Sequence, residues 1–176
     1  METPGGPTLV GAAEVRQIAG RGFPIYRLAT GNGTLLAEMA RYSWFTIFLG
    51  RGQRILLPSG ALWRLRAVSW THAICPVMVD AEARKVAQAA PGAGNYGING
   101  RDYAFVLYPA EGHGRNNWIL RHHEDDVARM TRRPRAVEAA TPVPLAAVLL
   151  GFVVMQFGIP GQEQLATPGG WATAYR

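Results

Sequence analysis

The chain has 176 residues, a length typical of one domain, and 48% of them are hydrophobic, which excludes disorder along the whole chain. The net charge of +6 favours an anionic partner, although a genomic bias towards arginine codons is the simpler explanation, since Lys85 is the only lysine among 18 basic residues. The single cysteine, Cys75, excludes an intramolecular disulfide. Residues 1–10 lack the basic and then apolar pattern of a signal peptide, so we expect a cytoplasmic protein.

Residues 1–20 are rich in glycine and alanine, and we expect a loose N-terminal arm there. Strand-like sequence begins at Phe23. Residues 23–30 and 34–41 flank Gly31-Asn32-Gly33, and Asn-Gly between two such runs is a strong short-range signal for a β-hairpin.

Residues 62–68 alternate cleanly between apolar and basic side chains. Trp63, Leu65 and Ala67 share one face of an extended chain, while Arg64 and Arg66 share the other. This pattern predicts a half-buried antiparallel strand with its arginines in water. Further strands are expected at residues 42–49, 54–58, 77–79, 85–89, 103–108, 118–123 and 127–131. Short strands at intervals of about 8–12 residues, with turns between them, are typical of a sandwich or a barrel.

The apolar segment 143–159 contains no charged residue and invites two interpretations. A transmembrane helix is the first, but the prolines near its ends leave about 15 helical residues, or about 22 Å, which is short of the roughly 30 Å hydrocarbon core of a bilayer. A helix that is apolar on all sides can instead be buried inside protein. We favour the buried helix, starting after Thr141 as N-cap, and a membrane anchor is the alternative.

Two motifs suggest chemistry but lack the context that chemistry requires. Gly92–Gly97 matches the dinucleotide-binding pattern, yet aromatic strand-like sequence follows it where a helix is needed, so a loop between strands is expected. His122 and His123 precede three acidic residues, but neighbouring side chains on a strand point to opposite faces, so the two imidazoles are not expected to share a metal ion. No catalytic residue, metal site or cofactor is predicted.

The order of these elements resembles the Tubby C-terminal-like superfamily, and within it the LURP-one-related proteins and the phospholipid scramblases. The segments that carry the resemblance are Phe23–Met39, Tyr96–Leu107, Trp118–Met130 and Pro144–Ile159. The resemblance implies an all-β fold, a closed antiparallel β-barrel of about twelve strands wrapped around a hydrophobic C-terminal helix. The barrel is then expected at residues 21–161, with its central helix at 142–159 and a tail at 162–176.

The same resemblance implies lipid-related functions, such as phosphoinositide tethering and proposed lipid scrambling, and no catalytic residues. Scramblases of this kind carry a cysteine-rich stretch and an acidic calcium-binding segment just before the helix. Here that position reads Arg132-Arg133-Pro134-Arg135, followed by a single acid at Glu138. Calcium-triggered scrambling is therefore not expected.

Arginines supply the candidate binding residues. The densest group consists of Arg129, Arg132, Arg133 and Arg135, and a smaller group consists of Arg51 and Arg54. The simpler interpretation is that these arginines form a solvated rim of the barrel. The functional interpretation is that they bind anionic phospholipid headgroups at the periphery of a membrane. Nucleic acid is disfavoured, because Trp44, Trp63 and Trp118 are expected in the core and not as stacking platforms.

The sequence thus predicts a non-enzymatic barrel that binds anionic lipid or a lipid-like ligand. Two alternatives remain open at this point. One is a tail-anchored membrane protein with residues 143–159 as its span, and the other is a basic nucleic-acid-binding module.

Overall fold

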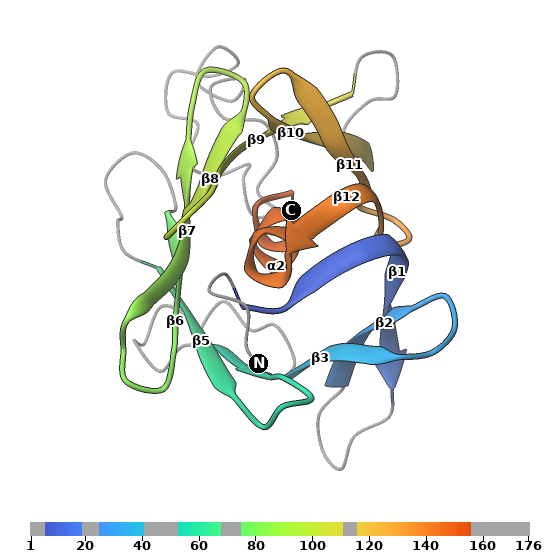
Figure 1. Cartoon of the computed structure of the whole chain (residues 1–176), viewed down its shortest axis with the longest axis vertical. Helices are drawn as coiled ribbons and strands as arrows, with labels where there is room; N and C mark the ends of the chain where they lie inside the picture. Colours follow the sequence, from blue (N-terminus) through green and yellow to red (C-terminus); the bar gives the residue numbers. More distant parts are fainter. Residues whose placement is uncertain (1–5, 19–24, 41–52, 68–74, 111–115, 156–176) are drawn as a thin grey trace, which may run out of the picture.

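Antiparallel strands form a closed barrel around a helix in the computed structural model, which describes residues 6–18, 25–40, 53–67, 75–110 and 116–155 (Figure 1). Within these residues the strands are β1 (Thr8–Ile18), β2 (Ile25–Thr30), β3 (Leu35–Ala40), β4 (Gln53–Leu56), β5 (Leu62–Ala67), β6 (Pro76–Val79), β7 (Lys85–Pro91), β8 (Tyr96–Gly100), β9 (Ala104–Pro109), β10 (Asn117–His122), β11 (Asp125–Thr131) and β12 (Ala136–Pro144). The helix is α2 (Leu145–Val154). The expected twelve-stranded barrel with one C-terminal helix is confirmed.

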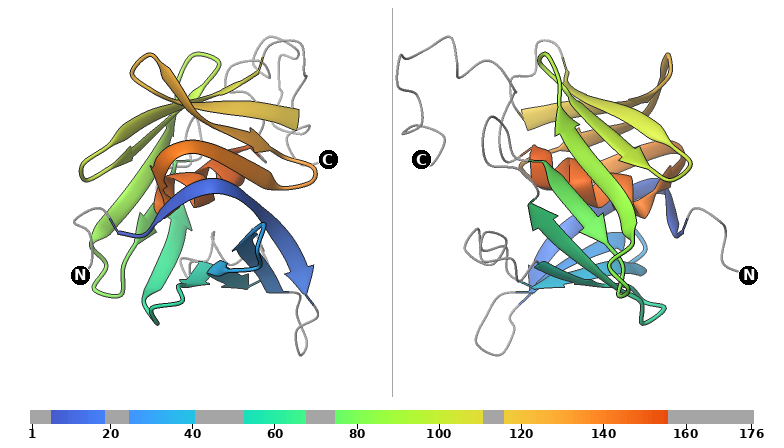
Figure 2. Two further views of the ribbon diagram at one scale, coloured as in Figure 1. Left: turned by 45° about the vertical axis from the view of Figure 1, so that its right-hand side comes forward. Right: turned by 90° about the vertical axis from the view of Figure 1, so that its left-hand side faces the viewer.

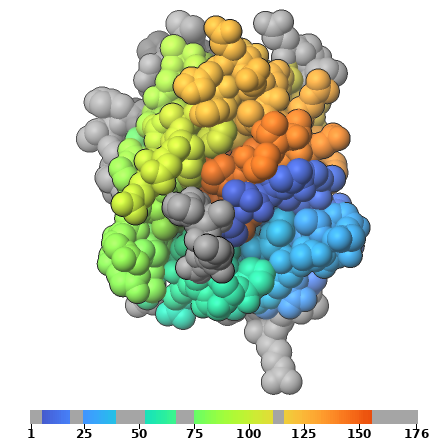
Figure 3. Space-filling view, in the orientation of Figure 1, coloured from blue at the N-terminus to red at the C-terminus, as the bar shows by residue number. Residues whose placement is uncertain are grey.

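Each strand pairs with the next along the chain, and β1 pairs with β12 to close the barrel. In this closing pair Thr8 lies opposite Pro144 and Glu14 lies opposite Ala136. Figure 3 shows the two strands side by side, β12 in orange and β1 in blue. Closure gives each described strand a paired neighbour on both sides, so none of them is an edge strand.

The expectation of a loose arm over residues 1–20 was wrong for the segment Thr8–Ile18. This segment is a full strand, with Leu9 and Ala13 buried in the core. The register of the closing pair shifts between Leu9 and Gly11, where β1 advances by two residues while β12 advances by four, from Val143 to Ala139, and Gly11 adopts a φ of +81°. Leu9, Gly11 and Ala13 alternate with exposed residues, but small side chains dominate the segment and hide this period of two in the sequence.

The expected helix boundaries also needed correction. Thr141 and Pro142 belong to β12, which continues to Pro144, and α2 begins only at Leu145. Proline fits an extended strand as well as a first helical turn, since its φ is near −65° in both. The Leu145 backbone N–H donates a hydrogen bond to the Pro7 carbonyl oxygen at 2.8 Å, which ties the start of the helix to the N-terminal segment. Positions 156–159 lie outside the described residues.

Every residue of α2 is buried, and the helix lies inside the barrel, as the right-hand view of Figure 2 shows. It packs most closely against β6, β7, β8 and β12. Ala87 and Ala89 on β7 are fully buried, and their small side chains allow this close approach. Gly151 serves the same purpose, because a Cβ atom there would lie 2.8 Å from the Met130 sulfur.

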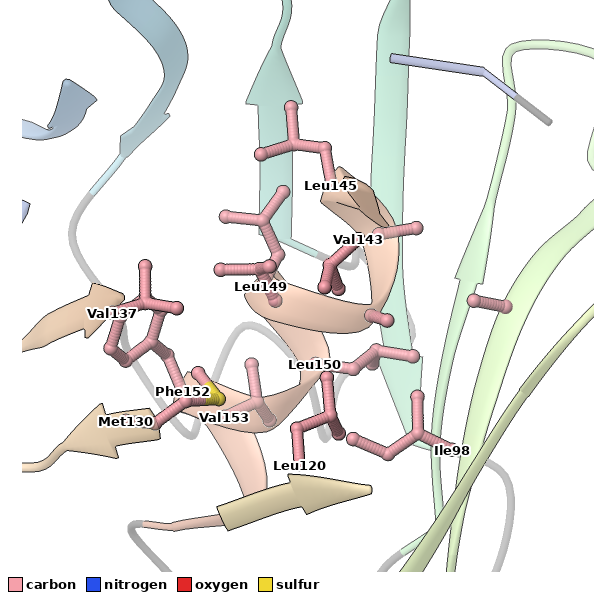
Figure 4. Packing of buried hydrophobic residues seen from close by; sticks show 14 of the residues in the cluster. Ile98, Leu120, Met130, Val137, Val143, Leu145, Leu149, Leu150, Phe152 and Val153 are labelled. Atoms are coloured by element: carbon pink, nitrogen blue, oxygen red, sulfur yellow. The ribbon is translucent and has the colours of Figure 1, made fainter. Parts of the chain in front are cut away.

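The helix presents different side chains to the two sides of the barrel. In Figure 4 Leu150 points towards Ile98 and Leu120, whereas Phe152 points towards Val137 and Met130.

Among the described residues, no helix is long and apolar enough to cross a bilayer.

The glycine-rich motif and the histidine pair both lie in hairpin turns. Gly92 begins the loop between β7 and β8, where its N–H donates to the Asn95 carbonyl at 2.8 Å, so the predicted loop between strands is confirmed. The prediction that His122 and His123 point to opposite faces was wrong. His123 has left the strand, with a φ of +54°, and its ring centroid lies 4.3 Å from that of His122.

Candidate functional site

The turn between β11 and β12, residues 132–135, carries three of the candidate arginines and is held in place by Asn116. The Arg133 N–H donates to Asn116 Oδ1 at 2.9 Å, and Asn116 Nδ2 donates to the Arg133 carbonyl at 3.1 Å. The Arg132 N–H donates to the Asn116 carbonyl at 2.8 Å. The backbone of the turn is therefore fixed to the segment that precedes β10, while the Arg133 side chain stays exposed.

Arg135 lies at the barrel end where β1 stops, β4 starts and α2 ends; we call this the Arg135 end. Its guanidinium carbon lies 5.4 Å from the centroid of the Tyr26 ring, a distance typical of a cation–π contact. Its carbonyl accepts a hydrogen bond of 2.8 Å from the Val15 N–H. Arg135 is thus half-buried and oriented by β1 and β2, while its charge stays at the rim.

Arg129 is not grouped with the turn arginines. It lies on the outer face of β11, exposed, and directly opposite Glu138 on β12. An acidic side chain in register offsets its charge. Arg51 falls outside the described residues, so the structure brings together Arg132, Arg133 and Arg135 of the predicted set, and places Arg54 elsewhere.

Arg54 belongs to a second basic group that the sequence did not reveal. It is exposed on β4 and lies directly opposite Arg64 on β5, and Arg66 follows two residues later on the same face. We call Arg54, Arg64 and Arg66 the β4–β5 arginines. The register of the β4–β5 hairpin places these arginines side by side. The hairpin has a short turn, closed by a 2.9 Å hydrogen bond from the Leu57 N–H to the Ala61 carbonyl. This turn is the sequence signal that could have predicted the pairing.

The β4–β5 arginines lack compensation from neighbouring groups. The Nε atoms of Arg64 and Arg66 are buried and, within the described part of the chain, meet no hydrogen-bond acceptor. In register with them, β6 offers Val79 opposite Arg64 and Val77 opposite Arg66. No ion pair formed by the described residues includes any of the three arginines.

Acidic residues on the neighbouring strands already have partners. Glu38 on β3 accepts a hydrogen bond of 2.8 Å from Arg27 Nε on β2, and Glu14 on β1 pairs with Arg16. These pairs neutralise the outer face of β1–β3. The surplus of positive charge on this side of the barrel therefore rests on β4 and β5.

A cavity of about 30 Å³ opens inside the Arg135 end, between α2 and the strands β1–β5. Its described lining consists of Val15, Tyr26, Met39, Gln53, Ile55, Leu65, Arg135, Leu149, Phe152 and Val153. Gln53 is only 5% exposed and is the one polar or charged side chain that the described core buries. An apolar cavity with a guanidinium at its rim is suited to an amphipathic anion.

Another charged cluster, around Asp126, joins three strands of the barrel. On the outer face Asp126 accepts hydrogen bonds from Arg121 Nε at 2.7 Å and from the Tyr108 hydroxyl at 3.0 Å. The hydrogen bond from Arg121 lowers the pKa of Asp126, and partial burial raises the pKa of Tyr108. These contacts join β9, β10 and β11. Over the described ranges, no group of three His, Cys, Asp or Glu side chains could hold a metal ion.

Comparisons of the whole chain with protein-family models, with curated proteins and with solved structures find no match in any of the three.

Proposed function

We propose that the protein is a non-enzymatic barrel of the Tubby C-terminal-like kind that binds anionic lipid surfaces at its Arg135 end. The observation that carries the proposal is the group of β4–β5 arginines, with like charges in register and buried Nε atoms that meet no acceptor among the described residues. Arginine forks match phosphate and carboxylate geometry, so this group of guanidinium side chains is suited to an anionic headgroup.

Two basic groups flank the same half of the barrel. The turn arginines lie at its rim, and Arg66 is one residue from the end of β5 at that rim. Each basic residue near an anionic membrane contributes about 1 kcal/mol, so six arginines supply enough attraction for peripheral binding that weakens with salt. The architecture of the barrel and its internal helix agrees with what the resemblance implies.

Vesicle flotation tests the proposal. Full-length protein is mixed with vesicles of phosphatidylcholine alone or with about one third phosphatidylserine, at low and at raised salt. Binding is expected only with phosphatidylserine and only at low salt. Changing Arg54, Arg64 and Arg66 together to Gln, or Arg132, Arg133 and Arg135 together to Gln, should remove most of it.

A matched control loses the same charge at the other end of the barrel. Arg84 and Lys85 lie at the β6–β7 hairpin and Arg101 at the β8–β9 hairpin, all exposed, and all three are changed to Gln. This variant should bind as the wild type does. Equal losses in all three variants would overturn the proposed site, since net charge alone would then explain binding. Tighter binding to single-stranded nucleic acid than to vesicles would favour a nucleic-acid-binding module instead.

A further inference from the structure

The helix occupies one side of the barrel and leaves space on the other. A twelve-stranded barrel is wider than the small barrels whose side chains alone fill the interior, and α2 has a narrow surface of Ala146, Ala147 and Gly151 over part of its length. It packs against β6–β8 and β12. The cavity lies on the opposite side, between Leu149, Phe152 and Val153 of α2 and the inner faces of β1–β5.

The lining of this cavity is graded from apolar to charged. Leu149, Ile55 and Leu65 are at most 1% exposed and form its apolar inner part. Arg135, half-buried over the Tyr26 ring, stands at the rim. The buried Gln53 amide also belongs to the lining, so the cavity is mainly apolar with a cation held in position at one end.

Water is a poor occupant for such a space. A volume of about 30 Å³ could hold roughly two water molecules, each of which needs two to four polar partners. Seven of the ten lining side chains are aliphatic, Met or Phe and offer none, so only Tyr26, Gln53 and Arg135 bring polar atoms to the lining. An alkyl chain, in contrast, gains from contact with each of them.

We infer that this cavity takes the end of a single alkyl chain whose anionic head is bound by Arg135. The ligand class is a single-chain amphiphile with a carboxylate head. The inference rests on the proposed function, because the inference names the class of lipid that would bind at the same end of the barrel. Met39 lines the cavity and has an unbranched, flexible side chain, so it can move aside to lengthen the space for a longer chain.

The probes are straight-chain carboxylates of about two to ten carbons, titrated below their micelle concentrations and followed by calorimetry. Because each buried methylene favours binding, the Kd is expected to fall roughly fourfold per added carbon until the cavity is full, and then to stay constant. Arg135→Gln should weaken carboxylate binding about tenfold or more without affecting the uncharged alcohol of equal length. Arg101→Gln, the same change at the opposite end, should have no effect.

A second variant fills the cavity. Val15→Phe projects extra volume into it and should abolish the dependence of Kd on chain length, while Val153→Ile, a milder filling, should shorten the chain at which the dependence stops. The melting temperature of each variant shows whether it is folded. If Val15→Phe does not fold, the result for Val153→Ile decides the test. Unchanged chain-length dependence in a folded filled variant, or equal binding of a carboxylate and an alkyl ammonium, would overturn the inference.

The two proposals fail separately. Vesicle binding that survives in Val15→Phe, with the chain-length dependence of carboxylate binding lost, is expected if both are right. Carboxylate binding without any vesicle binding would remove the membrane proposal and keep the cavity ligand. Vesicle binding without carboxylate binding at any chain length would keep the membrane proposal and remove the cavity ligand.

Discussion

Arg54 on β4 lies directly opposite Arg64 on β5, so two positive charges face each other across neighbouring strands of the barrel. Like charges in this position destabilise a sheet by a few tenths to about 1 kcal/mol. The Nε atom of Arg64 is also buried away from any acceptor among the described residues. An anion bound between the two side chains would offset both costs, which is why this pair carries the proposed function.

A charge reversal at Arg54 should therefore stabilise the isolated protein. Arg54→Glu replaces a like pair with an opposite pair and offers Arg64 an acceptor, so the free energy of unfolding should rise by about 0.5–1 kcal/mol at low salt. Urea unfolding at low and high salt measures this, and the gain should shrink at high salt. Arg101→Glu, at an exposed turn of the opposite end, serves as the control. A lower urea midpoint for Arg54→Glu would contradict the geometry of the pair.

Loss of Asn116 should loosen the arginine turn. Its amide makes two hydrogen bonds with the Arg133 backbone, at 2.9 and 3.1 Å, so Asn116→Ala should cost about 1–2 kcal/mol of stability. Amide hydrogen exchange at residues 132–135 should speed up, while exchange in β6–β8 should not change. Asn117→Ala, one residue along, tests whether the effect belongs to this amide. Unchanged protection of the turn in Asn116→Ala would show that the backbone contact with Arg132 holds it alone.

The sequence predicted most strands because their side chains alternate or their turns are distinctive. The β5 strand alternates tryptophan and leucine with arginine, and the β2–β3 hairpin carries Gly31-Asn32-Gly33. It failed where the strands lack both signals. In β12, alanine, threonine and proline carry neither signal, so no strand was predicted over Ala136–Pro144.

The candidate site was only partly predictable for a related reason. A dense run such as Arg132-Arg133-Pro134-Arg135 is visible along the chain, but Arg54 and Arg64 become neighbours only through the register of two strands. The cavity depends on which side of the barrel α2 approaches, and that follows from small residues on β7, Ala87 and Ala89, far from the helix in sequence. Neither relationship has a local signature.

A charge placed inside the barrel should unfold it. Leu149 is 1% exposed on the cavity side of α2, and Leu149→Asp puts an unpaired carboxylate among apolar side chains at a cost of several kcal/mol. Circular dichroism should show loss of the strand signal or a melting temperature lowered by many degrees. Ala140→Asp, on the exposed face of β12, should leave the protein folded. A folded Leu149→Asp variant with wild-type stability would mean that α2 does not form the core.

Removal of β1 should be equally damaging, because the strand closes the ring. A chain that starts at residue 19 would leave the edges of β2 and β12 unpaired and would expose part of the core around Leu28 and Val137. We expect this truncated protein to aggregate on purification. Cooperative melting of a monomeric truncated protein, near the wild-type temperature, would instead restore the view of this segment as a dispensable arm.

The hydroxyl of Tyr103 offers a test at high pH. It is buried and meets no hydrogen-bond partner within the described structure, and burial raises the pKa of Tyr103 to about 12. An unfolded tyrosine has a pKa of about 10, so the unfolded chain loses this proton first as the pH rises. Below about pH 10 both states are protonated and the tyrosine adds no pH dependence. From about pH 10 to about pH 12 ionisation favours the unfolded state, and stability should fall.

Tyr103→Phe should therefore flatten the alkaline decline in the unfolding free energy without a cost at neutral pH. The ring contact with Phe105, at 5.3 Å between centroids, is kept, and the variant removes only a buried hydroxyl that lacks a described partner. Some decline should remain, because the pKa of Tyr108 is also raised. Urea unfolding at pH 7, 10 and 11.5 gives the comparison, with Tyr108→Phe, which removes the hydrogen bond to Asp126, alongside. If Tyr103→Phe lowered stability at pH 7 by more than about 1 kcal/mol, the hydroxyl would have a partner after all, and burial without a hydrogen bond would no longer explain the raised pKa.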